Sequence, residues 1–129
     1  MEILGIWRLK ELFFADENGT RNLGRDDIEA LESTEDNEDY KKLLRSDFII
    51  SENALEMYYK PKESEIEQAK EEGWEITEKG ILLESYPAKI IDGQLWLDYD
   101  RTGEEYFPTE IDNEGSIIIS GGIMKIEKA

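Results

Sequence analysis

The stretch that most constrains the fold of this chain is residues 80–128, where short apolar runs alternate with turn signals. Glycine, aspartate and asparagine stand between the runs, and these residues readily adopt the backbone angles of tight hairpin turns. Runs this short, repeated at about ten-residue spacing, predict an antiparallel meander. The predicted strands are residues 81–83, 89–91, 95–97, 105–107, 116–119 and 123–126, and the turn signals are Asp92-Gly93, Thr102-Gly103, Asn113-Glu114-Gly115 and Gly121-Gly122.

The first part of the chain predicts further strands. Residues 4–14 form the first predicted strand, and residues 47–51 and 54–60 form a predicted hairpin. Alternation along a strand places every second side chain on the same face. The residues that share one face of the first strand are Gly5, Trp7, Leu9 and Phe13.

Short helices interrupt these strands. Apolar residues spaced three and four apart predict two helices at about 25–33 and 36–45. A third helix is predicted near residues 63–72, because Ser64 and Glu67 have the spacing of a capping box.

The pattern predicts one domain that spans residues 1–129. Its mainly β content favours an antiparallel up-and-down β-barrel of about eight to ten strands, with short helices after strand 1 and near residues 63–72. The alternative is an α+β domain in which those helices cover an open antiparallel sheet. The two folds differ in strand order, because a closed barrel requires the first strand to pair with the strand at 123–128 or to lie at the edge of the meander.

The residue types that are absent exclude several kinds of chemistry. The chain has no cysteine and no histidine, which excludes disulfides, thiolate metal sites, cysteine nucleophiles and histidine-based catalysis. The remaining carboxylates, lysines, serines and tyrosines show no spacing that marks a catalytic pair. We therefore expect a protein that is not an enzyme, with no catalytic residues, metal site or cofactor.

The charge of the chain limits its partners. With 32 acidic and 15 basic residues the net charge is −17, so the surface repels nucleic acid and anionic membranes and keeps the protein monomeric. No apolar run approaches the roughly 18 residues of a membrane span. The first residues, Met1 to Gly5, lack the basic segment of a signal peptide, which favours a cytoplasmic protein.

The acidic residues are concentrated in one stretch. Between Asp26 and Asp39 there are eight acidic residues and no basic ones. A solvated helix face accounts for such a run. The alternative is functional: an acidic interaction module that binds a basic protein partner through long-range attraction.

The triplet Gly5-Ile6-Trp7, followed by an antiparallel meander, resembles the calycin superfamily of lipocalins and fatty-acid-binding proteins. The helices expected at 25–45 are similar to the fatty-acid-binding arrangement, and residues 61–80 resemble a helical insert of small lipocalin-like bacterial proteins. The resemblance implies a barrel that can hold a small hydrophobic ligand, with Trp7 as a structural plug at one end.

The resemblance also concerns the charged residues late in the chain. Lipocalins commonly cover the tryptophan with an arginine, and here the last strand offers Lys125 and Lys128. Intracellular fatty-acid-binding proteins hold a carboxylate with an R-x-Y pair near the C-terminus, and no arginine follows Arg101. A neutral or cationic apolar ligand is therefore expected.

Strand alternation predicts which side chains would line a ligand cavity. Barrels of about eight strands are either filled by side chains or leave room for one ligand, and a ligand site requires a pocket of about 300 Å³ or more. The leading functional hypothesis is binding of a small hydrophobic or amphipathic molecule inside the barrel. The expected lining residues are Leu55, Met57, Tyr59, Leu95, Leu97, Tyr99 and Met124.

Overall fold

The structure is a computed structural model that describes residues 3–16, 19–119 and 123–129. Its main element is an antiparallel sheet of eleven strands, nine of which form one path in the order β8-β7-β6-β4-β3-β1-β11-β10-β9. β2 is added beside β1, and β5 is added beside β6. The strands are β1 (Gly5–Asp16), β2 (Gly19–Gly24), β3 (Ser46–Ile50), β4 (Ala54–Tyr59), β5 (Ile76–Thr77), β6 (Gly80–Ile91), β7 (Gln94–Leu97), β8 (Phe107–Pro108), β9 (Glu110–Ile111), β10 (Ile117–Ile119) and β11 (Met124–Lys128).

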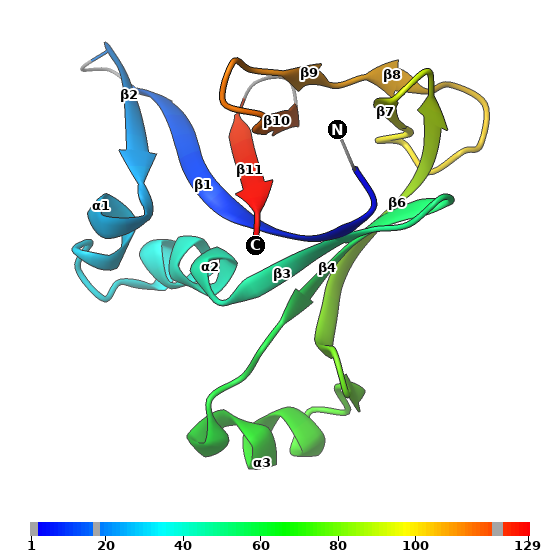
Figure 1. Cartoon of the computed structure of the whole chain (residues 1–129). Coiled ribbons are helices and arrows are strands. Elements are labelled where there is room, and N and C mark those ends of the chain that lie inside the picture. The colour runs from blue at the N-terminus through cyan, green and yellow to red at the C-terminus, as the bar shows by residue number, and fades with distance from the viewer. Residues whose placement is uncertain (1–2, 17–18, 120–122) are drawn as a thin grey trace.

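The sheet curls into a nearly closed barrel in which the first strand of the chain pairs with the last (Figure 1). β1 is antiparallel to both β3 and β11, so that Trp7 lies opposite Phe48 on one side and Lys128 on the other. The two ends of this strand order are β8 and β9. Along the chain only one residue, Thr109, lies between them. The predicted mainly β, antiparallel, barrel-like fold is confirmed, and the β1–β11 pairing favours it over the open sheet.

Two predicted strands are one strand. Residues 81–83 and 89–91 both belong to β6, which continues through Pro87. Pro87 has no N–H to donate, but its carbonyl accepts a hydrogen bond from the Asp98 N–H at 3.0 Å, and the next residue, Ala88, donates to Asn53 at 2.8 Å. β6 therefore stays hydrogen-bonded to its neighbouring strands around Pro87, whereas the prediction divided these residues into two strands.

The turns between strands follow the glycine signals where the structure describes them. At the β6–β7 hairpin, Asp92 and Gly93 have φ angles of 50° and 77°, the positive values that a two-residue hairpin loop requires. The predicted turn at Gly121-Gly122 lies outside the described residues.

Three short helices accompany the sheet: α1 (Arg25–Glu29), α2 (Glu35–Leu44) and α3 (Glu63–Glu71). Their positions confirm the predicted helical segments, although α1 is shorter than expected. The predicted capping of α3 is wrong, because the N-cap is Lys62 and its N–H donates to the Glu65 carboxylate at 3.0 Å. Figure 1 shows α3 beyond the ends of β4 and β6, away from the ring of strands. Within the described ranges, no helix has the length and apolar character needed to cross a bilayer.

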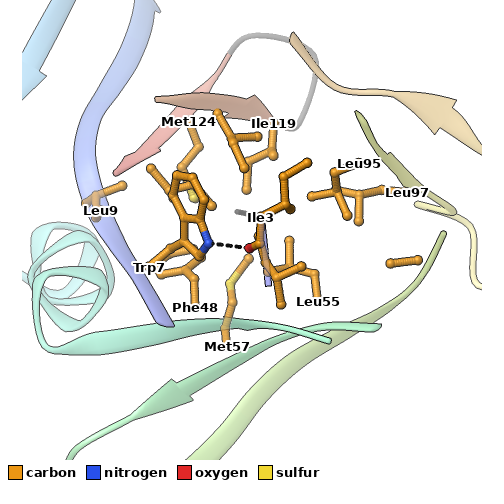
Figure 2. Packing of buried hydrophobic residues seen from close by; sticks show 14 of the residues in the cluster. Ile3, Trp7, Leu9, Phe48, Leu55, Met57, Leu95, Leu97, Ile119 and Met124 are labelled. Atoms are coloured by element: carbon orange, nitrogen blue, oxygen red, sulfur yellow. Dashed lines mark hydrogen bonds between the residues drawn. The ribbon is translucent and has the colours of Figure 1, made fainter. Parts of the chain in front are cut away.

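Apolar side chains fill the barrel (Figure 2). The main cluster holds sixteen buried residues, among them Trp7, Phe48 and Leu95. A smaller second cluster joins Tyr59 of β4, Ala69 of α3 and Ile81 of β6. The chain thus has one core inside the barrel and a satellite core where α3 packs on the sheet.

Candidate functional site

Six of the seven residues predicted to line a cavity gather in the barrel interior. Five of them are members of the main cluster with exposed fractions between 0 and 9%, and Tyr99 packs against that cluster. The five buried residues are Leu55, Met57, Leu95, Leu97 and Met124. Their side chains contact one another as a core does.

Tyr59 lies elsewhere, because β4 extends past the main cluster. Tyr59 pairs with Ile81 of β6 and packs with Ala69 of α3. Strand alternation gives the face on which a side chain lies but not its depth along the barrel. Tyr59 therefore does not line the barrel interior.

Trp7 is fully buried and is held by contacts with both ends of the chain. Its indole Nε1–H donates to the Ile3 carbonyl at 2.8 Å. The Lys128 ammonium lies 4.9 Å from the centroid of the indole ring and donates to the Leu4 carbonyl at 2.7 Å. Lys128 thus lies over the indole, where the lipocalin resemblance implies an arginine.

The interior is occupied by the chain's own N-terminal segment. Figure 2 shows Ile3 surrounded by Trp7, Leu55, Leu97 and other core side chains, and Ile3 is only 3% exposed. Ile3 precedes β1 and is the one described member of the main cluster that lies on neither a strand nor a helix. A ligand inside the barrel would have to displace it.

Open volume is found instead where α2 and α3 approach the ends of β4 and β6. Two adjoining pockets of about 200 and 460 Å³ share Lys42, Tyr59 and Glu65. We call the two pockets together the α2–α3 groove. The smaller pocket has an apolar wall of Pro61, Ala69, Trp74, Ile81 and Leu83, and the larger pocket adds the cations Lys41, Arg45 and Lys62.

Tyr59 lies at the junction of the two pockets. Its hydroxyl donates to the Glu65 carboxylate, with both oxygens at 2.9 Å. The Lys42 ammonium and the Arg45 guanidinium each lie 5.8 Å from the centroid of its ring, within the range of cation–π attraction. Burial, together with the hydrogen bond to Glu65, raises the pKa of Tyr59 to about 12, so the phenol is neutral at physiological pH.

Glu65 is held as a carboxylate. Burial by itself raises the pKa of Glu65, but hydrogen bonds from the Lys62 N–H and the Tyr59 hydroxyl, together with the Arg45 charge, lower it below its usual value. These donors occupy the carboxylate oxygens, so Glu65 organises the groove and stays ionised.

Arg45 follows α2 and faces the larger pocket. Its Nη1 is 3.7 Å from a Glu65 oxygen, and this nitrogen is buried without a hydrogen-bond acceptor among the described residues. A buried guanidinium nitrogen without an acceptor is energetically costly. Arg45 lines the larger pocket with a side chain that is 36% exposed, so a small turn of its guanidinium would bring the unused Nη1 donor to a ligand there.

Trp74 forms the exposed part of the apolar wall. Half of its surface is accessible, and its Nε1–H donates to the Glu72 carboxylate at 3.1 Å. A large aromatic ring exposed beside Ile81 and Leu83 offers a surface for apolar parts of a ligand.

A third described pocket, of about 480 Å³, lies near Trp7 and is lined by Lys10, Glu114 and Ser116. Its charged groups already have partners, because Lys10 bonds to both Glu114 and Ser116. Across the described residues, no three carboxylates converge in a way that would hold a metal ion. The α2–α3 groove is the better candidate site.

Sequence reasoning missed most of this groove. Of its residues, the predicted cavity contained only Tyr59. Lys42 and Arg45 stand near the end of a predicted helix, where basic residues suit the helix dipole in any case. Nothing local in the sequence indicates that Trp74 and Glu65 come to lie near them.

Comparisons with known proteins identify no relative: no family model, curated protein or solved structure matches this chain. Function is therefore inferred from the geometry of the groove itself.

Proposed function

We propose that this protein is a non-catalytic binding protein for a small amphipathic molecule, and that the α2–α3 groove is its binding site. The observation that carries the proposal is that two different pockets meet at Tyr59. One has an apolar wall, and the other is lined by cations. An amphipathic molecule presents the same two kinds of surface. The larger pocket, at about 460 Å³, falls within the usual range of about 300–1,000 Å³ for ligand sites.

The groove is favoured over the barrel interior because it is open without rearrangement. Binding inside the barrel would require Ile3 to leave a site where it is 3% exposed and where its carbonyl accepts the Trp7 hydrogen bond. Removing a buried isoleucine side chain from its core typically costs about 2–5 kcal/mol. A ligand in the groove has no such cost to overcome.

The resemblance to calycin barrels supports the class of function but not the position of the site. The pairing of β1 with β11 and the burial of Trp7 are features that such a barrel would have. A fold alone does not establish an activity, so the proposal depends on the groove.

Native mass spectrometry of the protein purified from cells tests the proposal. We expect wild-type protein to carry a bound small molecule, and Trp74→Ala to lose most of it because the apolar wall is shortened. Phe107→Ala is the matched control, since Phe107 is also an exposed aromatic, 42% accessible against 50% for Trp74, and lies on β8. Equal retention by both variants, or no bound mass in any of them, would contradict the groove as the site.

A second candidate is supported by the surface of α1 and α2. The described acidic side chains of the stretch from Asp26 to Asp39 are exposed: Asp26, Asp27, Glu29, Glu32, Glu35, Glu38 and Asp39. We infer that this face could bind a basic protein partner. Attraction between exposed charges is screened by salt, so partners captured at low salt should be released at about 0.5 M. Partners that remain bound at high salt, or a failure to capture any, would contradict this second candidate.

A further inference from the structure

The charge distribution of the α2–α3 groove indicates which kind of amphipathic molecule it fits. Four cations line the larger pocket: Lys41, Lys42, Arg45 and Lys62. Among the described side chains the same pocket has three carboxylates, Glu29, Glu38 and Glu65, so cations outnumber carboxylates there by 4 − 3 = 1. The smaller pocket adds Glu72, so the described charges of the whole groove balance, in a chain whose net charge is −17. The pocket is a local exception to an acidic surface.

The carboxylate nearest the junction of the pockets is already satisfied. Glu65 accepts hydrogen bonds from the Tyr59 hydroxyl and the Lys62 N–H, at 2.9 and 3.0 Å. Its contact with Arg45, at 3.7 Å, is an ion pair without a hydrogen bond. Glu65 therefore neutralises part of the charge of Arg45 without using the donors of its guanidinium.

One donor of Arg45 lacks a hydrogen-bond acceptor in the described part of the chain. Nη1 is buried and bonds to no acceptor among the residues that the structure describes. A planar guanidinium matches a carboxylate or phosphate group with two parallel hydrogen bonds. Arg45 and Lys42 both line the larger pocket, so an anion there would attract both cations and would give Nη1 an acceptor once the guanidinium turned towards the pocket. The two cations lie together beside the Tyr59 ring.

The apolar part of such a ligand has a defined direction. The pocket with the apolar wall adjoins the cationic pocket at Lys42 and Tyr59, so a chain attached to the anion would extend from Arg45 past Tyr59 towards Ile81 and Trp74. Two residues of this wall, Ala69 and Ile81, pack with Tyr59 in the satellite core, which holds the wall in position.

We propose that the ligand of the α2–α3 groove is an amphipathic anion, with a carboxylate or phosphate head at Arg45 and Lys42 and an apolar tail on the wall that ends at Trp74. This inference rests on the proposed function. It adds the sign of the head group and the orientation of the ligand, which the proposed function leaves open. It departs from the neutral or cationic ligand expected from the sequence, because the larger pocket gathers Lys41, Lys42, Arg45 and Lys62.

Titration calorimetry with four compounds that share an eight-carbon chain tests the inference. Octanoate and octyl phosphate carry anionic heads, octan-1-ol is neutral, and octylamine is cationic. We expect both anions to bind at least about tenfold more tightly than the alcohol and the amine, since a hydrogen bond to a charged group contributes about that much. The ratio of the two anion affinities shows which head the groove prefers.

Variants test the role of Arg45. Arg45→Gln should lower octanoate affinity about tenfold, the effect of one charge-assisted hydrogen bond. Arg101→Gln is the matched control, because its guanidinium also lies against a tyrosine ring, 4.6 Å from the centroid of Tyr86, and Arg101 does not line the groove. Lys42→Gln, which removes a charge in the last turn of α2, provides a second test if Arg45→Gln does not fold.

The outcomes separate the two proposals. Alcohol or amine binding as tightly as the anions, with affinity that falls in Trp74→Ala, would overturn the anionic head and leave the groove as a binding site. Anion binding that Arg45→Gln and Lys42→Gln leave unchanged would also overturn it. If none of the four compounds binds, both the inference and the proposed function fail.

Discussion

Replacing Trp7 with alanine is expected to lower the free energy of unfolding by about 4–6 kcal/mol. Trp7 exposes none of its surface and lies among strands β1, β3 and β11. Loss of transfer free energy and creation of a cavity together cost about 3–5 kcal/mol for truncation of a buried aromatic residue. That is a large share of the roughly 5–15 kcal/mol that stabilises a domain.

The hydrogen bond of the indole adds to this cost. Without Nε1–H the buried Ile3 carbonyl loses the donor that now lies 2.8 Å away, and an unsatisfied buried acceptor costs about 1–3 kcal/mol. For Trp7→Ala we use the lower end of this range, because the cavity that the variant leaves admits water that can reach the Ile3 carbonyl. Trp7→Phe separates the two effects, since it keeps most of the ring volume and lacks the N–H, and it should cost about 1–3 kcal/mol.

Urea denaturation followed by far-ultraviolet circular dichroism is the suitable assay, because Trp74 and Trp96 would complicate fluorescence. At a slope of about 1–3 kcal/mol per molar urea, the midpoint of Trp7→Ala should fall by more than about 1 M. Glu32→Ala, at an exposed position, should change stability by less than about 0.5 kcal/mol. If Trp7→Ala unfolds at the same urea concentration as Glu32→Ala, Trp7 does not stabilise the core and the reasoning is refuted.

Three further predictions concern local geometry. Gly80→Ala should lower the free energy of unfolding, measured in urea melts, by at least about 2 kcal/mol. The φ angle of Gly80 is +116°, and an added Cβ would clash with the Tyr59 carbonyl oxygen. Gly93→Ala is the control and should cost less, because nothing lies within 4 Å of the Cβ that it adds. Thr34→Ala should cost about 1 kcal/mol in thermal melts, since it removes the N-cap of α2. Folding raises the pKa values of Tyr59 and Tyr86 from 10 to about 12. The two protonated phenols therefore stabilise the folded state fully below pH 10, and this contribution is lost as the pH rises through 12. A free energy of unfolding that does not change between pH 10 and 12 would refute this prediction.

Much of the fold could be predicted because its strands carry a buried face. In β3 and β7, exposure alternates from residue to residue, and each strand is marked in the sequence by a short apolar run, Phe48-Ile49-Ile50 and Leu95-Trp96-Leu97. β2 was not predicted because it buries almost nothing: its first four residues are exposed, so no apolar pattern marks it. The separate strands predicted at residues 81–83 and 89–91 are one strand, because the Pro87 carbonyl accepts a hydrogen bond from Asp98 and the Ala88 N–H donates to Asn53.

The candidate site was less predictable for a physical reason. The alternation of side chains along strands correctly predicted that Leu55, Met57 and Leu95 lie together inside the barrel. It gives no information on whether another segment fills the space between them. Ile3 does so from outside the strand pattern. The groove, in turn, depends on how α3 is placed against β4 and the end of α2, which is a tertiary relation that no local spacing expresses.

The meeting of β8 and β9 gives the barrel a seam. No ladder pairing joins these strands in the described sheet, and only the backbone at Thr109 connects them. Thr109 itself is tied to β7, because its N–H and hydroxyl donate to Leu95 and its carbonyl accepts from the Gln94 side chain at 2.8 Å. Elsewhere along the path neighbouring strands are held by a ladder of hydrogen bonds, whereas no such ladder holds β9 beside β8 in the described sheet. A protein opens locally where its interactions are fewest. The diameter of the barrel should therefore fluctuate most where β8 meets β9, and water should first reach the core there.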